Sequence, residues 1–154
     1  EKPENLIAMA GDNRKGGVQM KHFVLASHGN FAAGIMDSLE LIMGPQSNFE
    51  AFCAYRDGKN DIKDRVRAIV DAKKPEEDLI IVTDVFRGSV NNEFMNYTDR
   101  SGIYVIAGMN LALLLELQVN QDMDSVTMIR AAIRSAQETI LFCNEKSEVQ
   151  DEDF

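Results

Sequence analysis

From residue 20 onward, short apolar runs alternate with segments in which apolar residues recur at helical spacing. The short runs are rich in β-branched and aromatic residues, which is typical of strands. They predict strands at residues 23–27, 49–55, 79–84 and 103–108. This alternation favours an α/β fold, so we expect one domain with a doubly wound, mostly parallel sheet in the order 2-1-3-4 and helices on both faces.

Helices are predicted between these strands. The first ends at Gly44 and Pro45, and one of its faces carries Ile35, Met36, Leu39, Ile42 and Met43. Later helices are predicted at residues 62–70, 89–97 and 125–138. The apolar segment 109–119 fits either the core or a dimer interface, and we favour the interface because a small domain has little room to bury it.

The two ends of the chain depart from this pattern. Residues 139–144 (TILFCN) have strand-forming residues but no following helix, so we expect an antiparallel edge strand that is free to reach a neighbouring subunit. Residues 1–19 are polar and rich in Gly and Asn, and we expect a vector-derived or disordered leader there. Residues 145–154 form a mostly acidic tail. The folded domain is therefore expected at residues 20–144.

Composition excludes several classes of function. A chain with a formal net charge of −9 lacks the basic footprint of a nucleic-acid binder, and anionic membranes would repel it. No run approaches the roughly 20 apolar residues of a membrane span. The two cysteines make no disulfide framework, so we expect a cytoplasmic protein whose partners are small molecules or other proteins.

Two loops at one edge of the predicted sheet carry candidate chemistry. The sequence SHGNFA follows the first predicted strand, and TDVFRGSVNN follows the third. In the order 2-1-3-4 these strands are neighbours, about 4.8 Å apart, so we expect His28 and Asp84 to hydrogen-bond. A carboxylate on one ring nitrogen fixes the tautomer and leaves the other nitrogen free for nucleophilic attack.

The second loop adds groups that suit phosphate. Gly88 and Ser89 lie where a helix is predicted to begin, so unpaired backbone N–H groups and a hydroxyl should face the same cleft. Arg87 is a further candidate for phosphate contact. Nucleophile, orienting carboxylate and phosphate cradle together predict a phosphohistidine at His28, a chemistry that needs no metal or cofactor.

The motifs SHGNFAAGI and IIVTDVFRGSVNN resemble those of the enzyme IIA component of the mannose family of the bacterial phosphoenolpyruvate:sugar phosphotransferase system (PTS). The resemblance extends over residues 20–144 in element order and length. It implies that His28 accepts a phosphoryl group on Nε2 from the phosphocarrier protein HPr and passes it to a IIB component, for sugar uptake through the membrane components IIC and IID. It also implies that Asp84 holds Nδ1, that Ser89 binds the phosphoryl group, and that the protein is a homodimer with exchanged C-terminal strands.

Two positions depart from the usual family motif GGSPNN. Arg87 stands where the family has a glycine, and Val90 stands where it has a proline. A guanidinium beside a phosphoryl group would strengthen phosphate binding or slow its release. Val90 keeps an N–H that proline lacks. These departures bear on transfer rate and on partner choice.

The sequence leaves structural roles and other functions open. Taken alone, His28 fits an exposed loop residue, Asp84 a turn or capping residue, and Arg87 a solvated side chain. A second hypothesis is a receiver-like module phosphorylated on Asp84, although the first strand ends in Ser27 and His28 rather than in carboxylates for Mg²⁺. A third is the phosphotransfer subunit of a dihydroxyacetone kinase. That relative usually lacks a glycine after the histidine, so Gly29 favours sugar uptake.

Overall fold

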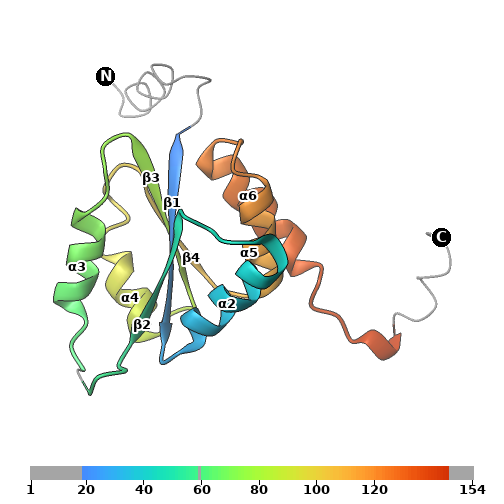
Figure 1. Ribbon diagram of the computed structural model, residues 1–154, viewed down its shortest axis with the longest axis horizontal. Coiled ribbons are helices and arrows are strands. Elements are labelled where there is room, and N and C mark those ends of the chain that lie inside the picture. The colour runs from blue at the N-terminus through green and yellow to red at the C-terminus, as the bar shows by residue number, and fades with distance from the viewer. Residues whose placement is uncertain (1–18, 59, 146–154) are drawn as a thin grey trace.

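Four parallel strands form the centre of the structure, a computed structural model that describes residues 19–58 and 60–145 (Figure 1). Their order is β2-β1-β3-β4, and each pairing is parallel. The strands are β1 (Met20–His28), β2 (Phe49–Ala54), β3 (Glu77–Thr83) and β4 (Ile103–Ala107). The predicted α/β fold and strand order are confirmed.

Helices cover both faces of this sheet (Figure 1). Helices α3 and α4 pack on one face, and α2, α5 and α6 pack on the other. Their bounds are α2 (Phe31–Met43), α3 (Lys63–Asp71), α4 (Ser89–Met95), α5 (Leu111–Val119) and α6 (Ser125–Gln137). The sheet is therefore buried on both sides, which explains why its strands are nearly continuous apolar runs.

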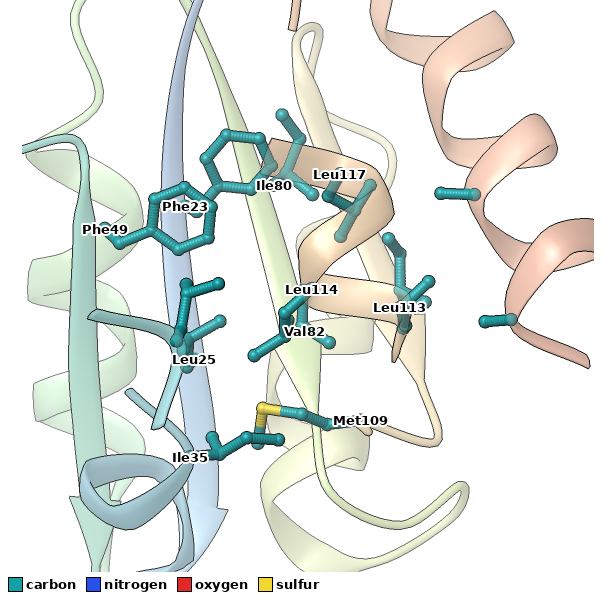
Figure 2. Packing of buried hydrophobic residues seen from close by; sticks show 14 of the residues in the cluster. Phe23, Leu25, Ile35, Phe49, Ile80, Val82, Met109, Leu113, Leu114 and Leu117 are labelled. Carbon is teal, nitrogen blue, oxygen red and sulfur yellow. The ribbon is translucent and has the colours of Figure 1, made fainter. Parts of the chain in front are cut away.

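Two apolar layers hold the helices to the sheet, because successive strand residues point to opposite faces. Phe23 and Ile80 point towards α2, α5 and α6, and the Phe23 ring stacks on that of Phe49 with ring centres 4.3 Å apart (Figure 2). Val24 and Ile81 point to the opposite face, towards α3 and α4. This double layer fixes the strand ends relative to one another.

Much of the apolar segment 109–119 lies in the core. Residues 111–119 form α5 (Figure 2), and its Leu113, Leu114 and Leu117 are at most 2% exposed. These leucines pack between the sheet and the helices α2 and α6. The interface role that the sequence favours for this segment is therefore wrong for them, because one chain covers them by itself.

Residues 139–144 form no strand within the single chain. After α6 the chain runs away from the sheet, and Cys143–Glu145 form a short 3-10 helix (Figure 1). Ile140, Leu141 and Phe142 are 81%, 48% and 65% exposed. The predicted antiparallel edge strand is not seen here because the segment leaves the sheet, and exchange of this strand between subunits stays a prediction.

The predicted leader (1–19) and acidic tail (145–154) lie outside the described residues apart from Gln19 and Glu145. In the part of the chain that is described, none of the helices combines the length and apolarity needed to span a bilayer. The site at the carboxyl edge of the sheet is built entirely from described residues.

Candidate functional site

His28 and Asp84 lie side by side at the carboxyl edge of the sheet. His28 is the last residue of β1, and Asp84 directly follows β3, the neighbouring strand. The imidazole Nδ1 and the carboxylate Oδ2 are 2.8 Å apart, and the backbone N–H of His28 donates to the same oxygen at 2.8 Å. The predicted contact is confirmed, because the parallel register brings the ends of the two strands together.

Three N–H groups fix the carboxylate of Asp84. Oδ2 accepts two from His28, and Oδ1 accepts the backbone N–H of Val85 at 2.9 Å. Burial alone would raise the pKa of Asp84, but the backbone and side-chain hydrogen bonds from His28, together with that from Val85, outweigh burial and lower the pKa. Asp84 is therefore ionised at neutral pH, and Nδ1 must donate a proton to it.

The other ring nitrogen of His28 faces Ser89, with Nε2 and Ser89 Oγ 3.1 Å apart. Since Nδ1 holds the proton that is donated to Asp84, the neutral ring has a lone pair on Nε2, and the Ser89 hydroxyl donates to it. The side chain of His28 is 45% exposed, whereas that of Asp84 is 11% exposed. The imidazole is therefore the more open member of the pair.

The turn after β1 holds His28 in place. Gly29 has a φ of +57°, which glycine adopts without strain, and its N–H donates to the carbonyl of Ala54 at 2.9 Å. The hydroxyl of Ser27 accepts the N–H of Ala32 at 2.7 Å and so caps the first turn of α2. Each residue of the SHG motif thus has a separate task at the strand end.

The loop between β3 and α4 holds Arg87 in a left-handed conformation. Its φ of +65° costs a residue with a Cβ about 1–2 kcal/mol. Asn91 Oδ1 accepts its N–H and Asn92 Nδ2 donates to its carbonyl, both at 3.1 Å. The guanidinium lies over the ring of Phe86, 5.3 Å from its centre. Contact of Arg87 with phosphate stays a prediction.

Gly88 leaves room for the imidazole. A Cβ at this position would lie 3.2 Å from His28 Cε1 and 3.2 Å from the carbonyl oxygen of Val85. Its φ of −67° is open to any residue, so glycine is needed here for space rather than for conformation. The Gly88 N–H donates to the Val85 carbonyl at 3.1 Å. The predicted phosphate contact of Gly88 therefore stays a prediction.

Tyr55 also reaches the site, and sequence reasoning missed it. It directly follows β2, and its Oη lies 2.8 Å from Ser89 Oγ. Strand β2 pairs with β1 on the side opposite β3, with Ala54 beside His28. The available signal was the strand order itself, because the order 2-1-3 places the end of the second strand next to that of the first.

Comparison with known families agrees with this arrangement. The sequence model of the family EIIA-man, the PTS system fructose IIA component, matches residues 22–134. The chain belongs to this family. A PTS system sorbose-specific EIIA component from Lacticaseibacillus casei is 29% identical to this IIA chain over 108 residues, which are 69% of this chain and 78% of the relative.

Solved structures show the same fold. One is the crystal structure of a phosphoenolpyruvate-dependent sugar PTS permease from Klebsiella pneumoniae subsp. pneumoniae. It is 36% identical with a TM-score of 0.80, and the match covers 83% of this chain and 94% of the permease chain. The PTS component EIIA from Streptococcus agalactiae is 27% identical with a TM-score of 0.69, and the match covers 82% of this chain and 99% of the EIIA chain. The chain is thus a IIA component of a sugar phosphotransferase system, and members of this family are phosphotransferases.

The structure explains how this IIA component accommodates its two departures from the motif GGSPNN. Arg87 adopts a backbone conformation that suits the usual glycine, and the side chains of Asn91 and Asn92 hold it there. Val90 is fully buried in the apolar layer beneath α4. Of the two departures, only the first therefore places a different side chain on the exposed surface near the site.

Proposed function

We propose that this IIA component accepts a phosphoryl group on Nε2 of His28 from HPr and passes it to a IIB component. The observation that carries the proposal is the 2.8 Å contact between Nδ1 and the ionised Asp84, which in the neutral ring leaves a lone pair on Nε2 of a side chain that is 45% exposed. In this proposal the component works in the cytoplasm, and the membrane components IIC and IID couple the transfer to sugar uptake.

The transfer needs no change in the protonation of His28. The lone pair of Nε2 attacks the phosphorus of the donor phosphohistidine, and the Nε2–P bond forms as the donor N–P bond breaks. The bonding pair stays on the donor nitrogen, which leaves as a neutral imidazole when its other nitrogen carries a proton. The ring of His28 becomes positive, and the carboxylate of Asp84 stabilises that charge through the Nδ1 proton.

Ser89 supports the phosphoryl oxygens in this proposal. Its hydroxyl lies 3.1 Å from Nε2 in the free site. A phosphoryl group on Nε2 would take up the lone pair, so the hydroxyl would then donate to a phosphoryl oxygen. Ser89 also begins α4, where the first N–H groups have no partner within the helix. No metal is needed, because the donor phosphohistidine is already reactive and alignment of the reacting atoms supplies much of the rate.

Exposed apolar side chains near the imidazole suit a protein partner. Phe31 at the start of α2 is 49% exposed, and Val85 and Phe86 after β3 are 58% and 63% exposed. Such side chains are typical of the centre of a protein interface. Because the donor and the acceptor must reach the same nitrogen of His28, we expect HPr and IIB to use this surface in turn.

The alternative functions have less support. The Asp84 oxygens already accept three N–H groups, which disfavours a receiver-like acceptor. Within residues 19–58 and 60–145, no three side chains of His, Cys, Asp or Glu come together to hold a metal ion. A dihydroxyacetone kinase subunit would use the same chemistry at His28, but the relatives reported above are named for sugar systems. Gene neighbours encoding IIB, IIC and IID components would support sugar uptake.

The direct test of the proposal is to map the phosphorylated residue. The chain is incubated with phosphoenolpyruvate, enzyme I and HPr, and its peptides are sequenced by mass spectrometry at neutral pH; the control reaction omits HPr. We expect one phosphoryl group on His28 that is lost in acid and kept in alkali. A group on Asp84, labile in strong alkali, would favour the receiver-like hypothesis, and an unlabelled chain would contradict the proposal.

Gly88→Ala is expected to slow phosphorylation and leave the fold intact. The added Cβ must displace the imidazole by a few tenths of an ångström. We expect a rate roughly 10-fold lower, because a reacting group misplaced by about 1 Å loses up to about 100-fold. Gly34→Ala in α2 is the matched control, since its Cβ would meet open space. Stopped reactions with phosphorylated HPr measure both rates, and equal rates would contradict the steric role of Gly88.

We also propose a homodimer in which residues 139–144 of each copy pair with β4 of the other. Strand β4 is an edge of the sheet and pairs with β3 alone. A groove of about 460 Å³ runs beside it and is lined by residues 98–105, Val126, Ile129 and Arg130. The exposed side chains of Ile140, Leu141 and Phe142 would fill such a groove. Exchange would therefore cover an open strand edge and an exposed apolar segment together.

Phe142→Asp is expected to weaken this dimer. Burying a phenylalanine is worth about 1.5–3 kcal/mol and a buried unpaired charge costs more, so the dissociation constant should rise about 100-fold or further. Sedimentation equilibrium measures it. Leu41→Asp is the control, because Leu41 is 87% exposed on α2, which packs near the opposite edge of the sheet. A monomeric wild type, or a Phe142→Asp dimer of unchanged affinity, would contradict strand exchange.

A further inference from the structure

The end of β2 contributes a hydroxyl to the site. Tyr55 Oη lies 2.8 Å from Ser89 Oγ, which in turn lies 3.1 Å from Nε2 of His28. The rings of Tyr55 and His28 also lie close, with centres 5.6 Å apart. Tyr55 therefore approaches the nucleophile in two ways: its ring directly, and its hydroxyl through Ser89.

The ionised carboxylate of Asp84 sets the direction of each hydrogen bond in this chain. In the neutral ring Nδ1 of His28 donates to Asp84, so Nε2 offers only a lone pair. Ser89 must give its single proton to Nε2, and its oxygen can then only accept from a further partner. The hydroxyl of Tyr55 is therefore the donor to Ser89.

The backbone of Tyr55 is strained in a way that apolar packing does not explain. Its φ of +64° lies in the left-handed region, where a bulky side chain is rare and where strained residues often mark functional sites. The ring packs against the apolar layer beneath α3 and α4. A phenylalanine would supply the same packing, so the feature that calls for tyrosine is the hydroxyl and its bond to Ser89.

We propose that Tyr55 is a positioning residue for phosphoryl transfer, which acts by fixing the hydroxyl of Ser89. This inference rests on the proposed function of His28 as phosphoacceptor. A serine hydroxyl without a second partner turns among staggered positions. Donation from Tyr55 occupies a lone pair of Ser89 Oγ and leaves the Ser89 proton directed at Nε2.

The same constraint acts after the phosphoryl group arrives. The Ser89 proton, still held in direction by Tyr55, would point at a phosphoryl oxygen bound beside Nε2. Donation from Tyr55 also polarises the Ser89 hydroxyl and makes it a stronger donor. This hydrogen bond stabilises the site most where negative charge develops on the phosphoryl oxygens during transfer. Tyr55 is therefore expected to affect the rate of transfer rather than the stability of the fold.

Tyr55→Phe removes the hydroxyl and keeps the ring. We expect the initial rate of His28 phosphorylation by phosphorylated HPr to fall about 3- to 10-fold, the factor that one neutral hydrogen bond supplies. Tyr97→Phe is the matched control, because it removes the same hydroxyl from a residue that follows the far end of α4 and packs under Arg100, 4.8 Å from its guanidinium. We expect the control to keep the wild-type rate and both variants to keep the wild-type melting temperature.

A double-mutant cycle with Ser89→Ala tests the route of the effect. Because Tyr55 acts through Ser89, Tyr55→Phe should change the rate by less than about 1.5-fold once Ser89 is alanine. An equal loss in both backgrounds would overturn the inference, as would a wild-type rate for Tyr55→Phe alone. An unlabelled His28 in the wild-type chain would defeat the proposed function and this inference together, so the two failures are distinguishable.

Discussion

His28→Asn is expected to abolish phosphorylation by phosphorylated HPr. Asparagine has no atom at the position of Nε2, so no nucleophile would face a docked donor. Its amide N–H takes the place of Nδ1 and keeps a donor for Asp84. We therefore expect the free energy of unfolding to change by less than about 1 kcal/mol. Mass spectrometry of the intact chain measures the label, and urea unfolding measures the stability.

His22→Asn is the matched control for this experiment. His22 is the other of the two histidines, lies near the start of β1, and bonds to Glu50 at 2.9 Å. We expect this variant to be phosphorylated at the wild-type rate. Label on the His28→Asn chain would contradict the proposal, and the stability of that label in acid and alkali would show whether the carboxylate of Asp84 had accepted it.

Asp84→Asn is expected to slow the transfer about 10- to 100-fold rather than abolish it, because a hydrogen bond to a charged group is worth about 1.5–3 kcal/mol. The nucleophile remains, but the positive ring of His28 loses its counter-charge. Asp71→Asn is the matched control, since it removes a carboxylate from an exposed pair with Arg100 at 2.8 Å. Rates measured with phosphorylated HPr should be normal for the control, and a normal rate for Asp84→Asn would contradict the role of Asp84.

The same variant should change how stability depends on pH. The pKa of Asp84 in the folded chain is below its ordinary value of 3.8, so folding favours the ionised carboxylate. The resulting stabilisation is fully present above that ordinary value and is lost as pH falls through the lower pKa of the folded state. The difference in unfolding free energy between wild type and Asp84→Asn should therefore be constant near neutral pH and shrink below about pH 4. Urea unfolding across this range tests it.

Much of the fold follows from patterns along the chain. A sheet covered on both faces requires continuous apolar strands, so segments such as β3 stand out in the sequence without knowledge of their neighbours. The ends of elements are less well defined: α4 ends at Met95 rather than at residue 97. The environment of segment 109–119 was harder still to predict, because an apolar run has the same sequence pattern whether its own chain or a second subunit covers it.

The pair at the centre of the site could be predicted because it depends on topology alone. Given the order 2-1-3-4, His28 and Asp84 fall at the ends of adjacent parallel strands. The same order places Tyr55 near His28, but its bond to Ser89 could not be predicted, because it depends on a left-handed backbone conformation that no local sequence pattern indicates. The steric need for Gly88 likewise depends on where the imidazole lies.

The sequence by itself determined the alternation of strands and helices, the strand order by way of common topology, and the two loops that carry His28 and Asp84. These features depend on periodicity and on residue type, which are properties of the chain alone. Only the tertiary structure decided which ring nitrogen of His28 faces Asp84, the space beside Gly88 and the hydrogen bond between Tyr55 and Ser89. Those features depend on distances of a few ångströms between atoms that the chain brings together from three different strand ends.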